Sequence, residues 1–117
     1  MKEFFKSFND ALNGIRASLR EQRNVKVQGT IALISVGAGF YFDITFVEWG
    51  FILFAIGLVI GLEIMNSAIE GLVDLVTRGE RKPLAGKVKD VAAGAVLFAS
   101  VIALIIGVLV FRKYLLI

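Results

Sequence analysis

The stretch from Val91 to Phe111, VAAGAVLFASVIALIIGVLVF, decides the fold class of this 117-residue chain. Its 21 residues carry no charge. As an α-helix rising about 1.5 Å per residue, they are long enough to cross the ~30 Å hydrocarbon core of a bilayer. Thirteen of them are Val, Leu, Ile or Phe, and their insertion is favourable by about 4 to 8 kcal/mol in total. We therefore predict an all-α membrane protein.

The composition of the whole chain supports this class. Hydrophobic residues make up 57% of it and charged residues 20%, and the mean hydropathy is +0.80, whereas soluble domains are about 45–50% apolar and about 25% charged. Because the chain has no Cys and no His, we exclude a disulfide scaffold, a thiolate metal site and histidine-based catalysis. The pI of about 9.5 could indicate nucleic-acid binding, but the basic residues flank apolar segments. Membrane orientation explains them better, so we expect no nucleic-acid partner.

Two further apolar segments precede the decisive stretch. Residues 29–42 are too few to span unless the helix extends over about 25–47, with Lys26 snorkelling back to the headgroups. The next segment starts at the interfacial aromatic Trp49 and stays uncharged to Leu62, which predicts a helix over about 49–75. With a helix over about 90–112, the chain has three predicted transmembrane helices and a loop at about 76–89.

The N-terminal segment has a different pattern. Its apolar residues recur every three or four positions, which is typical of one face of a helix: Phe4, Phe5, Phe8, Ala11, Leu12, Ile15 and Leu19. Cations surround that face, so we predict an amphipathic helix over about 3–22 lying in the membrane interface. The segment lacks the apolar core of a cleavable signal and is expected to remain in the mature protein.

The distribution of Lys and Arg predicts the orientation. Residues 1–28 carry six, residues 75–90 carry five, residues 43–48 carry none, and the tail carries Arg112 and Lys113. One side of the membrane would thus carry eleven Lys and Arg residues and the other side two. This distribution predicts a cytoplasmic N-terminus and a cytoplasmic 76–89 loop, with the C-terminus outside.

Small residues indicate where helices touch. Gly57 and Gly61 form a GxxxG motif, and a second row repeats every four residues: Ala95, Ala99, Ala103 and Gly107. Small residues are also simply common in such helices. Three short helices need partners, so we expect a homo-oligomer.

Acidic residues interrupt the second predicted span near its C-terminal end. If about 20 residues from Trp49 cross the hydrocarbon, the boundary falls near residue 69 and Glu63 lies about 9 Å inside it. An acidic side chain at that depth costs a few kcal/mol and usually marks function. At about 100° per residue, one helical stripe contains Glu63, Asn66, Ser67, Glu70 and Asp74.

Position along the stripe suggests a chemistry for each carboxylate. Glu70, at the boundary, could form with a second carboxylate the hard oxygen site that Mg²⁺ prefers when it carries nucleotide phosphates. Glu63 is less hydrated, which disfavours its charged form and suits a general base for a lipid hydroxyl. The loop beyond the stripe is cationic and could hold phosphates: Arg78, Arg81, Lys82, Lys87 and Lys89.

Each of these features has a purely structural alternative. The stripe could be interhelical hydrogen-bonding glue, and the positive-inside rule alone could explain the basic loop. Glu21, taken by itself, is a solvated helix charge. The Glu48–Trp49 pair is most simply an interfacial anchor and helix start.

The blocks FNDALNGIRASLREQRN (8–24), EIMNSAIEGLVD (63–74) and KDVAAGAV (89–96) resemble those of a known family. It is the family of prokaryotic-type lipid kinases, small integral membrane diacylglycerol and undecaprenol kinases, and the resemblance covers nearly the whole chain as a single lipid kinase domain. It implies a homotrimer in the bacterial plasma membrane that transfers the γ-phosphate of MgATP to a lipid alcohol, with sites shared between subunits. The Glu48–Trp49 pair and the KDVAAGAV block are more similar to the undecaprenol kinase branch. Both lipids present a primary hydroxyl, so the stripe itself does not distinguish them.

The resemblance also implies roles for individual residues. Glu63 is similar to the catalytic base and Asn66 to its neighbour in the site. Glu21 and Glu70 match the carboxylates that hold the metal with the nucleotide. The remaining matches are nucleotide contacts: Lys89, Asp90 and the acidic loop residue Glu80.

Some positions depart from the family pattern. Where the family usually reads Glu-Tyr-His before Pro-Leu-Ala, this chain reads Glu80-Arg81-Lys82, one residue further from Asp74 than expected. Further departures are Gly86 for a basic residue, Asp10 for Tyr, and Gln28 where many members have His. Arg81 and Lys82 can still hold phosphate, so we expect altered nucleotide affinity before loss of activity.

Three functional hypotheses follow. The leading one is an ATP-dependent lipid kinase acting on undecaprenol or, alternatively, on diacylglycerol. A second is a non-catalytic helical membrane subunit whose carboxylates line a water path. A third is a kinase-like chain with a degraded nucleotide loop. The chain has no P-loop and no evident phospho-carrier, so direct transfer to the lipid is the simplest mechanism.

Overall fold

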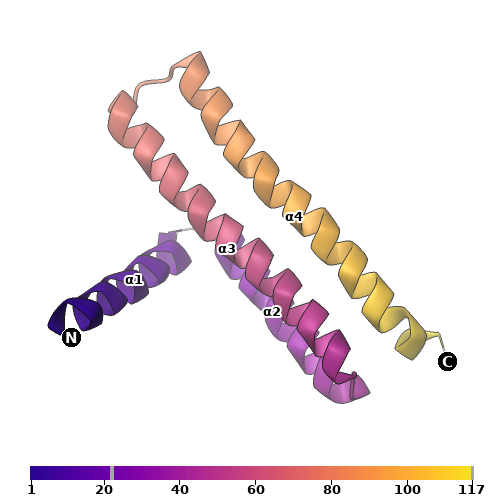
Figure 1. Cartoon of the computed structure of the whole chain (residues 1–117). Coiled ribbons are helices and arrows are strands. Elements are labelled where there is room, and N and C mark those ends of the chain that lie inside the picture. The colour runs from indigo at the N-terminus through magenta and orange to yellow at the C-terminus, as the bar shows by residue number, and fades with distance from the viewer. Residues whose placement is uncertain (22, 117) are drawn as a thin grey trace.

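The computed structural model describes residues 1–21 and 23–116, with side chains for residues 1–20 and 24–116. Within these residues the chain forms four α-helices: α1 (Lys2–Glu21), α2 (Arg23–Phe42), α3 (Phe46–Thr77) and α4 (Pro83–Leu115). In Figure 1, α3 and α4 run side by side, α2 lies along the N-terminal part of α3, and α1 leaves the bundle at a steep angle. The predicted all-α fold is confirmed.

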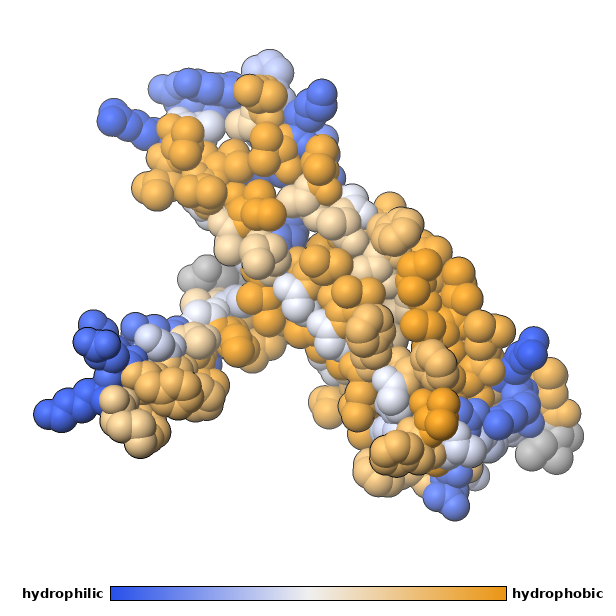
Figure 2. All heavy atoms as spheres, viewed as in Figure 1, coloured by the Kyte–Doolittle hydropathy of each residue, from blue (hydrophilic) through white to orange (hydrophobic). Residues whose placement is uncertain are grey.

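Three of the described helices, α2, α3 and α4, are long and apolar enough to cross a membrane. Figure 2 shows hydrophobic atoms along the middle of the bundle and hydrophilic atoms gathered at its two ends. On α1 the hydrophilic atoms lie mainly on the side towards the turn between α3 and α4, and the hydrophobic atoms on the opposite side. The exposed apolar residues of α1 include Phe4, Phe8 and Leu12, so this helix is amphipathic as predicted.

The connection between α2 and α3 is short, and α2 ends at Phe42 instead of continuing towards residue 47. The reason is local: Asp43 has φ of 51°, a left-handed conformation that stops a helix. Thr45 then caps α3 in a capping box, in which its hydroxyl accepts from the Glu48 backbone N–H and its own N–H donates to the Glu48 side chain. The interpretation of Glu48 as part of a helix start is therefore confirmed.

The connection between α3 and α4 is shorter than the expected loop over 76–89. Helix α3 continues to Thr77, and Arg78 and Gly79 reverse the chain with φ of 54° and 80°. Helix α4 then begins at Pro83, whose fixed φ and missing N–H suit a first helical position. Between α3 and α4 only residues 78–82 lie outside the helices, so Lys87 and Lys89 belong to α4.

At the opposite end of the bundle, Ile44, Ile52 and Val110 form a small buried core surrounded by partly buried aromatic residues. The Trp49 ring packs directly on Gly39 of α2, so that a Cβ at Gly39 would lie 2.6 Å from the Trp49 Cη2 atom. Real Cβ atoms essentially never approach another heavy atom that closely. Gly39 is therefore required for the contact between α2 and α3.

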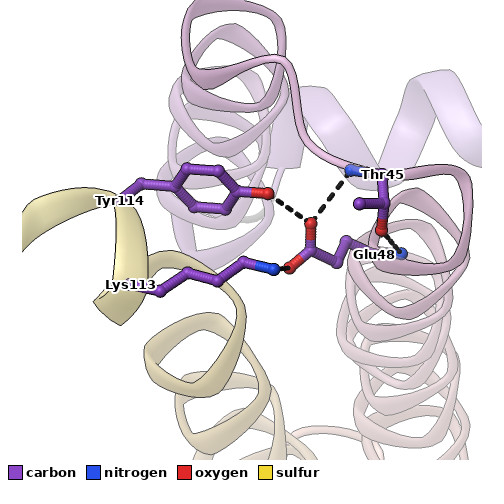
Figure 3. Close-up of polar contacts among 4 residues, drawn as sticks. All are labelled: Thr45, Glu48, Lys113 and Tyr114. Atoms are coloured by element: carbon purple, nitrogen blue, oxygen red, sulfur yellow. Dashed lines mark hydrogen bonds and ion pairs between the residues drawn. The ribbon is translucent and has the colours of Figure 1, made fainter.

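A polar cluster closes the same end, and we call Thr45, Glu48, Lys113 and Tyr114 the Glu48 cluster (Figure 3). The Tyr114 hydroxyl donates to Glu48 Oε1 at 2.5 Å, and Lys113 Nζ lies 3.0 Å from Glu48 Oε2. The Thr45 N–H also donates to Oε1 at 2.9 Å. The cluster thereby ties the first turn of α3 to the last turn of α4.

Candidate functional site

The predicted acidic stripe lies on α3 where α1 and α2 meet that helix. Its first two members are the most buried, with exposed fractions of 1% for Glu63 and 6% for Asn66. Glu70 is half-buried and Asp74 is exposed. Burial therefore decreases along α3 towards the turn at Arg78, and the stripe connects the interior of the bundle to a polar end.

Among the described residues, the Glu63 carboxylate is held by two amide side chains of α2. Gln28 of α2 donates from Nε2 to Glu63 Oε2 at 3.5 Å, and Asn24 makes a further side-chain contact with Glu63. The other oxygen, Oε1, is buried and has no hydrogen-bond partner among the described residues. A buried acceptor without a partner costs about 1–3 kcal/mol, so Oε1 is positioned to accept a proton or a hydrogen bond from a ligand.

Asn66 contacts the next carboxylate of the stripe, Glu70. Its Nδ2 donates to Glu70 Oε1 at 3.3 Å, which orients the Glu70 carboxylate. The Asn66 Oδ1 atom is buried and, like Glu63 Oε1, lacks a partner in the described part of the chain. Glu63 Oε1 and Asn66 Oδ1 are thus two buried acceptors that a ligand could satisfy.

Helix α1 docks beside these residues through two serines. Ser18 Oγ donates to Ser67 Oγ at 3.4 Å, and Ser67 Oγ donates to the Glu63 carbonyl at 3.2 Å. The Glu21 side chain, predicted as a metal ligand, lies outside the described residues. Among the described side chains, no three carboxylates gather closely enough to hold a metal by themselves. Glu70 is a hard oxygen donor of the kind that Mg²⁺ takes in small number alongside substrate phosphates and water, so the donor chemistry fits a nucleotide-bound Mg²⁺.

An open cavity of about 500 Å³ with several charged lining residues lies between the end of α3 and the start of α4. Its charged lining residues are Asp74, Glu80, Arg81, Lys82 and Lys89. Lys89 Nζ lies 2.6 Å from Asp74 Oδ1, and Lys82 Nζ lies 4.0 Å from Glu80 Oε2 at the exposed rim. Asp90 is exposed next to Lys89 on α4. The structure thus brings the basic residues of the turn together with the last residue of the stripe.

An apolar groove of about 680 Å³ runs between α2, α3 and α4. It begins at Asn24 and Gln28, the residues that contact Glu63, and its lining continues to Arg112 near the end of α4. Its walls include Ile31, Val59, Ala103 and Leu104. The Glu63 carboxylate therefore lies beside the polar head of an otherwise apolar groove.

The sequence singled out Glu63, Asn66 and Glu70, and the structure connects them in one stripe. It separates them from the turn cavity, where Glu80 and Lys89 lie. The sequence predicts no role for Ser18, and it marks Gln28 only as a position where many members of the similar family have His. The contact between Gln28 and Glu63 joins residues 35 positions apart, and no local pattern reveals such a contact.

Comparison with known proteins gives a consistent result. A family model described as prokaryotic diacylglycerol kinase matches residues 9–111. The undecaprenol kinase of Bacillus subtilis is 41% identical over 111 residues, covering 95% of this chain and 89% of that protein. A diacylglycerol kinase of Helicobacter pylori is 33% identical over 115 residues, covering 98% and 86%. The diacylglycerol kinase of Escherichia coli K12 is 32% identical over 92 residues, covering 79% and 75%.

Proposed function

The chain belongs to the prokaryotic diacylglycerol kinase family and is a membrane lipid kinase, and from this premise we propose that it phosphorylates undecaprenol with the γ-phosphate of MgATP. The observation that carries the proposal is the buried Glu63 carboxylate beside the head of a mainly apolar groove, with one oxygen that has no partner among the described residues. The 41% identity to an undecaprenol kinase, against 33% and 32% for two diacylglycerol kinases, favours the isoprenoid alcohol. Diacylglycerol is the alternative substrate.

Glu63 is the catalytic base in this proposal. Its Oε1 accepts the proton of the lipid hydroxyl while the hydroxyl oxygen attacks the γ-phosphorus of ATP. The bond between the γ-phosphorus and the oxygen that bridges it to the β-phosphate breaks in the same step. ADP leaves with the electron pair of that bond, and the proton on Glu63 passes to water afterwards. The atoms balance without a covalent intermediate on the protein.

The apolar groove supports a lipid alcohol as the acceptor. Its head is polar because Asn24 and Gln28 lie there, and the rest of its walls are mainly aliphatic. The long apolar chain of a lipid alcohol could lie in the groove against these aliphatic walls. Its hydroxyl would then lie at the end of the groove next to Glu63. Continuity between groove and carboxylate is the reason to assign the groove to the substrate chain and not to a second copy of the protein.

The nucleotide is assigned to the polar end of the stripe. Glu70, oriented by Asn66, and Glu21 would hold Mg²⁺. Ser18 contacts Ser67. Ser18 lies three residues before Glu21, and Ser67 lies three residues before Glu70, so the contact supports placing the two carboxylates near each other. When bound, Mg²⁺ would neutralise charge that develops on the transferring phosphoryl group.

The cavity at the turn is proposed to hold the rest of the nucleotide. Lys89 and Asp90 would contact it, Glu80 would lie at its rim, and Arg81 and Lys82 would supply positive charge for phosphates. Lys89 is already paired with Asp74 at 2.6 Å, so nucleotide binding must compete with that pair. The departures in this turn therefore affect nucleotide affinity first.

The placement of α1 supports a cytoplasmic site. An amphipathic helix lies in the membrane surface, and the contact between Ser18 and Ser67 puts α1 level with residue 67 of α3. The boundary expected near residue 69 agrees with this level, so Glu63 would lie just inside the membrane and the turn outside it. With the positive-inside rule, the turn and the N-terminus face the cytoplasm.

The small residues of the spans support a homo-oligomer, and the family resemblance implies that it is a homotrimer with shared sites. Ala99 of α4 is 1% exposed within the single chain, whereas Gly57 and Gly61 of α3 are exposed, with nothing within 4 Å of an added Cβ. Ala99 thus packs inside the subunit, and the GxxxG face remains for a neighbouring subunit.

The test is transfer of label from γ-labelled ATP in mixed micelles that offer undecaprenol and diacylglycerol in parallel, with Mg²⁺ present or chelated. We expect Mg²⁺-dependent label in undecaprenol, in preference to diacylglycerol, and none with Glu63→Gln. Preferential label in diacylglycerol would overturn the substrate assignment, and persistent turnover by Glu63→Gln would overturn the base.

A further inference from the structure

Gln28 is a polar residue in the wall of the apolar groove, and it contacts the carboxylate assigned as the base. Resting on the proposed role of Glu63, we infer that Gln28 is a positioning residue that fixes the Glu63 carboxylate so that Oε1 faces the substrate hydroxyl. Gln28 donates to Oε2, while Oε1 has no partner in the part of the chain that the structure describes. The two oxygens therefore have separate tasks, one for anchoring and one for accepting the proton.

The reason for an anchor lies in the freedom of a glutamate side chain. Glu63 has three rotatable side-chain torsions, and the terminal one is broad and has no sharp preferred value. The amides that contact its carboxylate come from Gln28 and Asn24 of α2, across the interface between two helices. A displacement of about 1 Å in a reacting group can lower turnover by about 100-fold, so the anchor decides whether Oε1 meets the hydroxyl.

Gln28 is the better placed of the two amides for this task. It is half-buried, whereas Asn24 is exposed at the start of α2. The Nε2–Oε2 distance of 3.5 Å is long for a hydrogen bond, and catalytic hydrogen bonds in proteins without ligand commonly tighten only when the substrate is bound. A substrate chain in the groove would exclude water from this contact and strengthen it.

The position of Gln28 also argues against a purely structural role. It lies in the wall of a groove whose other lining residues are mainly apolar. A leucine there would fill similar space and would add to the apolar wall. Packing alone therefore favours an aliphatic residue, and the hydrogen bond that the Gln28 amide makes within the described residues is the one to Glu63 of α3, which gives the amide a task there.

The experiment compares Gln28→Leu, which removes the donor, with Gln28→His, which restores an N–H donor of similar reach. Thr30→Val is the matched control, because it removes a polar group from the same helix at an exposed position where Thr30 bonds only to the Lys26 carbonyl. Each purified variant is assayed in mixed micelles for kcat, for KM of the lipid and for KM of ATP. Its thermal unfolding temperature is measured in the same detergent.

We expect Gln28→Leu to lower kcat by about 10- to 100-fold while KM for ATP stays within about twofold. Gln28→His is expected to recover most of the loss, and Thr30→Val to behave as the wild type. The inference is overturned if Gln28→Leu keeps kcat within about twofold, if histidine restores nothing, or if the loss follows a lowered unfolding temperature. An inactive Glu63→Gln beside a fully active Gln28→Leu rejects the inference alone, whereas an active Glu63→Gln rejects the proposed base.

Discussion

Helix α3 carries two glutamates with little exposure, and their surroundings are opposite. Glu48 in the first turn is bonded by Tyr114, Lys113 and the Thr45 backbone, so both of its oxygens have partners. Glu63 is more deeply buried, yet within the described residues only one of its oxygens has a hydrogen-bond partner, at 3.5 Å. Among the side chains that the structure describes, glutamate on the same helix therefore has partners for both carboxylate oxygens at the start of α3, but not in its middle.

We interpret the difference as one between a structural carboxylate, Glu48, and the proposed reactive carboxylate, Glu63. A satisfied carboxylate strengthens the connection between two helices, because its bonds replace those lost to water. An unsatisfied buried acceptor lowers stability, and a catalytic role is one reason for which a native structure contains such an acceptor. The Glu48 cluster thus holds α3 and α4 together at one end, while the stripe from Glu63 remains available for chemistry.

The largest expected effect comes from removing the reactive carboxylate. Glu63→Gln should lower lipid phosphorylation by about 10²- to 10⁴-fold, because the amide cannot accept the hydroxyl proton. Its unfolding temperature should not fall, since the change removes an incompletely paired buried charge. Label transfer and thermal unfolding in detergent measure the two quantities.

The matched control is Glu48→Gln, which makes the same chemical change at the satisfied site. It should keep turnover but unfold at a lower temperature, because Lys113 loses its charged partner. If both variants lost turnover equally without unfolding, the contrast between the two glutamates would be wrong.

The second effect concerns the packing that supports the Glu48 cluster. Gly39→Ala should destabilise the protein by about 1–3 kcal/mol, because the new methyl group would overlap the Trp49 ring. Gly37→Ala is the control, since nothing lies within 4 Å of a Cβ at that position. Equal unfolding temperatures for the two alanine variants would show that Trp49 moves away without cost.

Much of the fold could be predicted from the sequence, because hydropathy and helical periodicity act over short distances. The uncharged run before Phe111 predicted the last span, and the recurrence of Phe4, Phe8 and Leu12 predicted the amphipathic helix. The helix ends were predicted less well. Asp43 adopts a left-handed conformation and Pro83 starts a helix inside the expected loop, and both depend on backbone geometry more than on composition.

The candidate site was predicted only in part, for a related reason. The stripe from Glu63 to Asp74 is visible because its members share one helical face. The partners of its members come from elsewhere in the chain: Gln28 is 35 residues from Glu63, and Ser18 is 49 residues from Ser67. Likewise, Lys113 was interpreted only as part of the charged tail, because its pairing with Glu48 depends on how α3 and α4 align.

The third effect tests one bond of the Glu48 cluster. Tyr114→Phe removes the hydroxyl that donates to Glu48 Oε1 but keeps the ring, which stacks on Phe42 with centroids 5.6 Å apart. The unfolding temperature should fall by less than in Gly39→Ala, because Thr45 and Lys113 still hold the carboxylate. Turnover should be unchanged, and Tyr41→Phe, at an exposed position, serves as the control in the same melting experiment.

The smallest effect concerns the docking of α1 beside the reactive carboxylate. Ser18→Ala removes the 3.4 Å bond to Ser67 and should weaken docking by about 0.5–1.5 kcal/mol. That loss should appear as faster backbone hydrogen exchange in α1, with no change in α3 or α4 near the Glu48 cluster, because local opening is measured where contacts are few. Ser7→Ala, exposed on the same helix, should leave exchange as it is. If Ser18→Ala instead made backbone hydrogen exchange faster to the same extent near the Glu48 cluster and near Glu63, the two regions of α3 would open as one cooperative unit. The contrast between the two glutamates would then be wrong.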